Sequence, residues 1–182
     1  MAVRDISRIP AVDKSSGAPN VIVETPKGGR TKFKYDEKLN LFKFDKALPF
    51  GHSFPFQFGF LTSTLGGDGD PLDLLVLSDE PAFVGCLVLG KLLGALQAEQ
   101  GPNGTKVRND RLIAVPVDAK TYKPVHPAKK LDTSLVSDIT KLFVSYNQMQ
   151  GKEFKPLGTA GGKREMEIVQ QGIKRAREKT KA

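Results

Sequence analysis

Short apolar runs separated by turn residues fill most of the chain before residue 120, a pattern that predicts β-strands. Strands are expected at 21–25, 31–35 and 41–46, with 27–30 as the turn of a hairpin that joins the first two. The run 72–77 predicts a short buried strand, and 81–96 predicts one or two more. A polar loop at 99–110 is then expected to lead into a strand at 111–117.

Helical spacing of apolar residues appears in the C-terminal part of the chain. A helix is expected from 132 to 150, where Asp132 or Thr133 can cap the start and Gly151 ends it. A second helix is expected from Glu165 to about Lys179, preceded by a flexible glycine-rich linker at 158–164. This linker does not match a Walker A loop, because Arg164 stands where Ser or Thr belongs.

Composition indicates one domain, 1–182, with an N-terminal extension at 1–19 and a basic C-terminal helix at 163–182. The 39% hydrophobic and 26% charged residues are typical of a globular protein, and no apolar run approaches the roughly 20 residues of a membrane span. Cys86 is the single cysteine and stands in an apolar segment, so we expect a core residue of a cytoplasmic protein.

The net charge of +8 raises the question of a polyanionic partner. Residues 163–182 contain seven Lys or Arg and three Glu, a local +4, so half of the excess lies in the terminal segment. The remainder is compatible with a pocket for a small phosphate compound. Nucleic acid is disfavoured as a partner, because the phenylalanine-rich segment 52–60 interleaves no Lys or Arg.

The strongest chemical signal is a glycine- and proline-rich turn that carries Asp68, Asp70 and Asp73 directly before an apolar run. Three carboxylates in one turn repel each other, and a hard divalent cation is the usual remedy. No Cys or His lies beside them, so Mg²⁺ or Mn²⁺ is expected rather than Zn²⁺. A calcium loop is disfavoured because Asp79 stands where its Glu belongs. An aspartate-rich turn that only shapes the backbone is the alternative.

The hexapeptide Asp-Gly-Asp-Pro-Leu-Asp at 68–73, followed by an aliphatic run, resembles the metal-binding motif of the soluble family I inorganic pyrophosphatases. The resemblance extends in consistent order from 21 to 152. It implies an α+β fold, a closed five-stranded, mostly antiparallel β-barrel of the oligonucleotide-binding type with flanking helices. It also implies a cytoplasmic, homo-oligomeric inorganic diphosphatase that uses Mg²⁺ to hydrolyse pyrophosphate to two orthophosphates.

The resemblance also implies a role for each matching side chain. The implied metal ligands are Asp68, Asp70, Asp73, Glu24 and Asn109. The implied phosphate-binding residues are Lys32, Lys46, Arg111, Tyr146 and Lys152. Asp70, Lys32 and Tyr146 would be catalytic, and the attacking water would be deprotonated by Asp70 or shared between two ions. A further loop aspartate of the family corresponds to Glu99, Gln100 or Asp110.

Several implied site positions depart from the family pattern. Lys34 replaces an acidic residue and Lys46 an arginine; the other departures are Phe54 and Phe58 for tyrosines, Asn109 for an aspartate and Asn147 for a lysine. The lost charges and hydroxyls predict slower hydrolysis than in typical members. Two alternatives follow: a catalytically degraded protein of this fold that binds RNA or another polyanion, or hydrolysis of a different phosphoanhydride.

Overall fold

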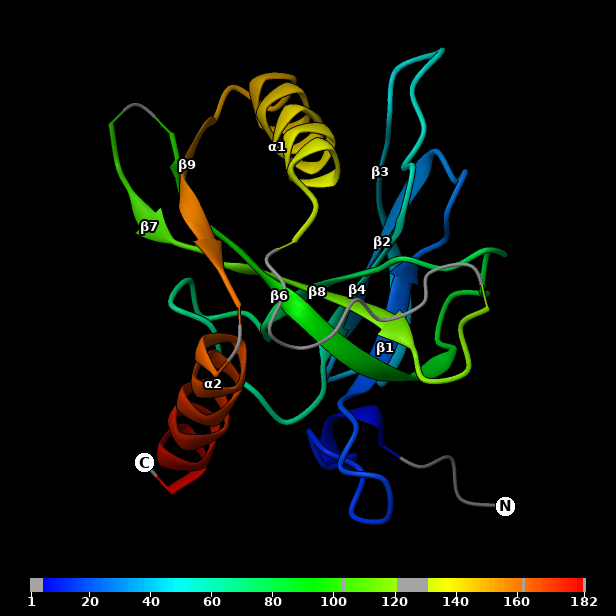
Figure 1. Ribbon diagram of the computed structural model, residues 1–182, viewed down its shortest axis with the longest axis vertical. Coiled ribbons are helices and arrows are strands. Elements are labelled where there is room, and N and C mark those ends of the chain that lie inside the picture. Colours follow the sequence, from blue (N-terminus) through cyan, green and yellow to red (C-terminus); the bar gives the residue numbers. More distant parts are fainter. Residues whose placement is uncertain (1–4, 103, 121–130, 162, 182) are drawn as a thin grey trace.

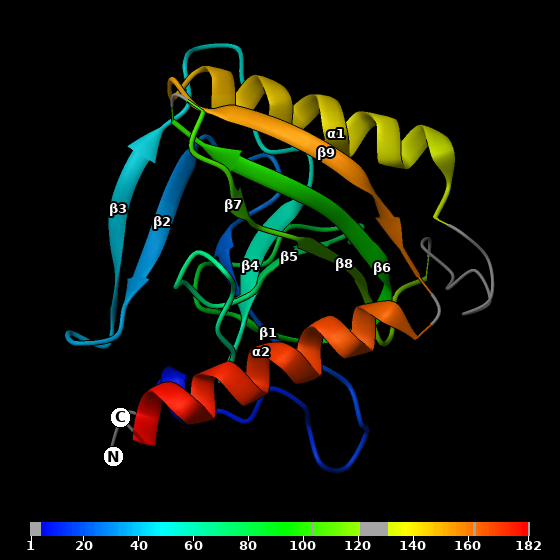
Figure 2. The same cartoon turned by 90° about the vertical axis from the view of Figure 1, so that its left-hand side faces the viewer.

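A computed structural model describes residues 5–102, 104–120, 131–161 and 163–181. A sheet occupies the centre, with helices α1 and α2 on opposite sides of it (Figure 1, Figure 2). A short 3₁₀ helix, Ile6–Arg8, precedes the first strand. The remaining elements, in chain order, are β1 Asn20–Thr25, β2 Thr31–Asp36, β3 Leu41–Ala47, β4 Gln57–Leu61, β5 Asp73–Val76, β6 Leu87–Gly101, β7 Val107–Arg108, β8 Arg111–Pro116, α1 Thr133–Gln148, β9 Glu153–Ala160 and α2 Arg164–Lys181.

Five strands pair in a ring. β1 pairs with β4, β4 with β5, β5 with β8, β8 with β6, and β6 returns to β1. The β5–β8 pair is parallel and the other four are antiparallel, in line with the expected mostly antiparallel arrangement. The long strand β6 also pairs with β7 and β9, while β2 and β3 form a separate two-stranded sheet. The fold is therefore sheet-rich and of the α+β class.

Central strands β5 and β8 are buried on both faces, which explains why their sequences read as continuous apolar runs. Alternate residues point to opposite faces and join two core clusters. The first cluster includes Leu74, Val76, Leu112 and Ala114, together with Ile168 and Val169 of α2. The second includes Leu75, Leu77, Ile113 and Val115, together with Ile139 and Phe143 of α1. Packing on both faces fixes the first residues of β5 and β8, and the acidic turn lies directly before β5.

The hairpin expected between the first two strands is wrong. β2 pairs with β3, and the connecting segment 26–30 bonds to the chain around Phe54 instead. Gly28 N–H donates to Phe54 O at 2.7 Å, and Phe54 N–H donates to Gly29 O at 2.9 Å. Gly28 has φ 76°, a conformation that favours glycine. These contacts direct β2 away from β1.

The flexible linker expected at 158–164 is also wrong in its first half. Gly158, Thr159 and Ala160 belong to β9, which pairs along seven positions of β6. Pro156 and Gly158 hide this strand in the sequence, because neither is typical of a strand interior. β6 itself runs to Gly101 and takes up the first part of the loop expected at 99–110. Long-range pairing thus overrides the local turn signals.

Cys86 is half-buried rather than a core residue, because it lies in the segment just before β6, most of whose residues are partly or fully exposed. Among the described residues, no helix has both the length and the apolar character needed to cross a membrane.

The expected helix at 132–150 is confirmed as α1, with Asp132 as its N-cap. The Asp132 carboxylate accepts hydrogen bonds from the N–H groups of Ser134 at 2.9 Å and Leu135 at 3.0 Å.

Asp132→Ala should lower the free energy of unfolding by about 1 kcal/mol, since two amide donors lose their acceptor. Thermal unfolding measures this as a drop in Tm of roughly 2–4 °C. Asp138→Ala on the exposed face of the same helix is the control, and an equal drop in both variants would contradict the capping role.

Candidate active site

The acidic turn is held by its own backbone. Gly66 N–H donates to Asp70 O at 2.6 Å. Gly69 adopts φ 88°, a conformation that would be strained for a residue with a side chain. Asp68 and Asp70 lie on this turn and Asp73 is the first residue of β5. The turn therefore delivers the three carboxylates to one end of the central strands.

The parallel register of β5 and β8 places Asp73 next to Arg111. Leu74 is opposite Leu112, so the first residues of the two strands are neighbours, and Arg111 Nη1 lies 3.1 Å from Asp73 Oδ2. Arg111 is only 4% exposed. Its guanidinium also donates to Gln100 Oε1 and to a backbone carbonyl, each at 2.8 Å. A buried arginine held by three acceptors forms a rigid positive anchor.

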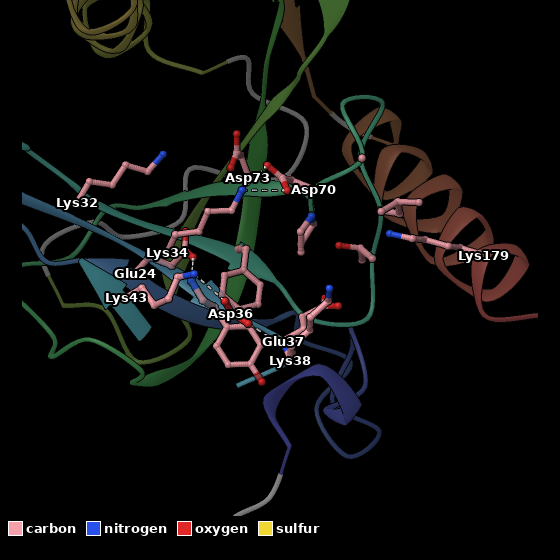
Figure 3. A pocket seen from close by; sticks show the side chains of 16 residues that line it. Glu24, Lys32, Lys34, Asp36, Glu37, Lys38, Lys43, Asp70, Asp73 and Lys179 are labelled. Carbon is pink, nitrogen blue, oxygen red and sulfur yellow. Dashed lines mark hydrogen bonds and ion pairs between the residues drawn. The ribbon is translucent and has the colours of Figure 1, made fainter. Parts of the chain in front are cut away.

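A cavity of about 220 Å³ opens at this end of the strands. All of the predicted site residues except Glu24 line it: Lys32, Lys46, Asp68, Asp70, Asp73, Asn109, Arg111, Tyr146 and Lys152. Glu24 lines a neighbouring cavity of about 590 Å³ that shares Lys32, Lys34, Asp70 and Asp73 with the first (Figure 3). The structure thus brings together side chains that lie as far apart in sequence as Lys32 and Lys152.

Each aspartate of the motif contacts a nitrogen of the protein. Asn109 Nδ2 donates to Asp68 Oδ2 at 2.5 Å, and the Lys34 ammonium lies 3.0 Å from Asp70 Oδ2. Asp73 is held by Arg111. Burial and the nearby charge of Asp73 nevertheless raise the pKa of Asp68 above its ordinary value. Burial therefore disfavours the charged form of Asp68 even though Asn109 donates to it.

In the part of the chain that the structure describes, no group of three or more His, Cys, Asp or Glu side chains is placed as a ready metal site. The chemistry of the donors still fits a hard cation, because Asp68, Asp70, Asp73 and Asn109 offer oxygen ligands alone. Mg²⁺ and Mn²⁺ both suit this set.

The same cavity is also lined by basic side chains. Lys46 Nζ donates to Gln150 Oε1 at 2.8 Å, and Lys32 Nζ lies over the rings of Phe58 and Tyr146, at 5.5 and 5.8 Å from their centroids. The Tyr146 hydroxyl is buried and has no hydrogen-bond partner among the described residues. An unpaired buried hydroxyl is costly unless a ligand accepts from it. Cations and a free donor together suit a small phosphate anion.

Burial and neighbouring charges shift the pKa of two further groups, Glu24 and Lys32. Burial raises the pKa of Glu24 from 4.5 to about 7, although Tyr35 N–H donates to its carboxylate at 2.9 Å. Burial alone would favour the neutral amine of Lys32, but Tyr146, Asp73 and other acidic groups around it outweigh this effect and raise its pKa. Lys32 therefore stays an ammonium at neutral pH.

Sequence reasoning missed part of the cavity lining. Phe143 and Gln150 were not expected there, although Phe143 lies about one helical turn before Tyr146 on α1 and Gln150 lies in the turn just after that helix. Among the three loop candidates, Gln100 lines the cavity, whereas Asp110 accepts from Ala98 N–H at 3.2 Å and pairs with Arg108 at 2.6 Å. Phe54 and Phe58 also line the cavity, so the two tyrosine replacements lie at the site.

Known proteins that resemble this chain in sequence and in structure are inorganic pyrophosphatases. The sequence model of the family described as inorganic pyrophosphatase matches residues 21–177. An inorganic pyrophosphatase of Synechocystis sp. is 32% identical over 170 residues, which are 93% of this chain and 98% of that protein. One of Methanosarcina acetivorans is 30% identical over 162 residues, 89% and 94% of the two chains. The crystal structure of inorganic pyrophosphatase from Thermus thermophilus superposes with a TM-score of 0.84 at 29% identity, covering 96% of this chain and 99% of that one.

The raised pKa of Glu24 makes the stability of the metal-free protein depend on pH. Because the folded protein favours the protonated form, this group stabilises it fully below pH 4.5, and the contribution is lost as the pH rises through about 7. Glu24→Gln keeps the acceptor for Tyr35 N–H and removes the charge. With EDTA present, we expect denaturant unfolding at about pH 8.5 to show the variant more stable by about 3 kcal/mol, with the gap shrinking toward zero near pH 4.5. A gap that does not change with pH would contradict the assignment.

Proposed function

The chain belongs to the inorganic pyrophosphatase family, and we propose that its 220 Å³ cavity hydrolyses pyrophosphate to two orthophosphates with Mg²⁺ as cofactor. The observation that carries this proposal is the cavity itself, whose lining combines three carboxylates with several cations and an unpaired buried hydroxyl. Pyrophosphate is a dense polyanion, so its hydrolysis needs positive charge at both phosphates and an activated water.

The basic residues of the cavity would bind the substrate. Lys32, Lys46 and Arg111 would neutralise phosphate oxygens, with Lys152 at the margin. The Tyr146 hydroxyl would donate to a phosphate oxygen, which would satisfy the group that the protein leaves unpaired. Because Arg111 is buried and already fixed by its acceptors, it would hold its phosphate without further ordering.

The acidic residues of the cavity would hold the cation. Asp68, Asp70, Asp73 and the Asn109 carbonyl oxygen would bind Mg²⁺, or Mn²⁺, and Glu24 would act from the neighbouring cavity. When bound, the ion would offset phosphate charge and acidify water. Asp70 would take the proton of the attacking water, whose oxygen bonds to one phosphorus as the bridging P–O bond breaks. Lys32 and Lys46 would stabilise the orthophosphate that leaves.

The substitutions at the cavity support slower turnover than in typical members. Phe54 and Phe58 carry no hydroxyl toward the substrate, and the Asn147 side chain donates to Phe143 O at 2.8 Å rather than offering a charge. Each missing charge-assisted bond is worth roughly 1.5–3 kcal/mol. Several such losses would lower the rate by orders of magnitude where nothing compensates.

Other features support finer proposals about the whole molecule. The ring of paired strands β1, β4, β5, β8 and β6 supports a closed five-stranded barrel. Phe83, Leu87, Leu89 and Val117 are exposed near the start of β6, and an apolar surface of this kind supports a homo-oligomer. A single cysteine is compatible with a protein of the reducing cytoplasm.

Replacing the proposed base tests the reaction. Asp70→Asn should reduce Mg²⁺-dependent release of orthophosphate from pyrophosphate by at least about 100-fold, because it removes both the proton acceptor and a metal ligand. EDTA should abolish release by the unmodified protein. Asp138→Asn on α1 is the control and should keep full activity. If the unmodified protein releases no more phosphate than the Asp70→Asn variant, it is not a pyrophosphatase.

Removing the unpaired hydroxyl separates function from folding. Tyr146→Phe should leave the free energy of unfolding unchanged or slightly raised, since the hydroxyl has no protein partner, but lower kcat/KM by about tenfold. The matched control is Tyr35→Phe, whose hydroxyl donates to Asn40 at 2.7 Å. That variant should lose about 1 kcal/mol of stability and keep kcat/KM. Equal kcat/KM in Tyr146→Phe and the unmodified protein would remove Tyr146 from the site.

A further inference from the structure

Lys34 contacts the acidic turn from the separate β2–β3 sheet. Its ammonium lies 3.0 Å from Asp70 Oδ2 and 3.2 Å from Oδ1, so it contacts both oxygens of the carboxylate (Figure 3). The two side chains lie 36 residues apart in sequence, so the tertiary fold produces the contact. Lys34 thus places a positive charge directly against one of the proposed metal ligands.

The position of Lys34 on β2 directs it to this carboxylate. Lys32 and Lys34 are two residues apart on the strand and share a face, and both line the two cavities that meet at Asp70 and Asp73. Across the hairpin, Lys43 is the direct partner of Lys34, yet it pairs with Asp36 at 2.8 Å. In Figure 3, Lys34 points to Asp70 and Lys43 points to Asp36. The contact with Asp70 is therefore specific to one position of the hairpin.

We propose that the Lys34 ammonium is an internal counter-cation of Asp70 that competes with the divalent ion and weakens the affinity of this site for Mg²⁺. This inference rests on the proposed function, because it concerns the same metal site. Lys34 is a positioning residue: it acts on the metal through Asp70 and not on the substrate.

The exposure of the pair makes competition feasible. The side chains of Lys34 and Asp70 are 55% and 56% exposed, so water screens their attraction and Mg²⁺ can reach the carboxylate. A pair of this kind is easily opened, but its positive charge also repels an incoming cation at short range. Asp68 and Asp73, by contrast, are held by the more buried donors Asn109 and Arg111. Lys34 is thus the partner whose removal frees a motif carboxylate with the least disturbance.

The test is isothermal titration of Mg²⁺ into the unmodified protein and a series of Lys34 variants at constant ionic strength. Lys34→Arg keeps the charge and should leave the dissociation constant near that of the unmodified protein. Lys34→Gln should bind Mg²⁺ on the order of tenfold more tightly, and Lys34→Glu more tightly still. Lys43→Gln removes the same charge from the opposite strand and should change the affinity by less than about twofold.

Thermal unfolding with and without Mg²⁺ provides a second readout on the same proteins, because at a given concentration a ligand that binds more tightly stabilises the folded state more. A larger Mg²⁺-dependent rise in Tm for Lys34→Gln than for Lys43→Gln would support the inference. Equal Mg²⁺ affinities in both of these variants and the unmodified protein would overturn it while leaving the pyrophosphatase proposal intact. Absence of Mg²⁺ binding in every variant, together with no phosphate release, would overturn the proposed function instead.

Discussion

Mutual repulsion among three aspartates in one short turn is the constraint on which this structure depends. The turn cannot carry Asp68, Asp70 and Asp73 at low cost unless positive groups lie near them. The protein supplies an amide, an ammonium and a guanidinium, one to each carboxylate. These donors come from two different parts of the chain, the loop and strand at 109–111 and the β2–β3 hairpin. The acidic turn therefore connects two segments that are distant in sequence, the hairpin and the start of β8, through contacts with its carboxylates.

The central strands convert this constraint into a site. Because β5 and β8 run parallel in register, the residue that begins one strand lies beside the residue that begins the other, and Asp73 meets Arg111. Burial of both faces of these strands between the two core clusters keeps that junction rigid. Helix α1 and the turn that follows it add Tyr146 and Gln150 to the cavity lining. Rigidity here matters because a polyanion is bound best by groups that are already oriented.

Local sequence patterns predicted a large part of this arrangement. The motif at 68–73 and the apolar run after it identified the acidic turn, and helical spacing with Asp132 as cap identified α1. The partners could not be predicted in the same way. β9 contains Pro156 and Gly158 and is stabilised by pairing with β6, so its local signal is weak. The contact between Lys34 and Asp70 depends on where the hairpin packs, and the sequence identified Lys34 only as a departure from the family pattern.

The proposed reaction requires the cavity to bind a cation at its carboxylates and phosphate at its basic residues at the same time. A crystal structure of the protein soaked with saturating Mg²⁺ and phosphate tests this most directly. We expect density for divalent ions among Asp68, Asp70 and Asp73. We also expect phosphate oxygens against Lys32, Lys46 and Arg111, with one within hydrogen-bond distance of the Tyr146 hydroxyl. Phosphate bound elsewhere, with no ion between the aspartates, would contradict it.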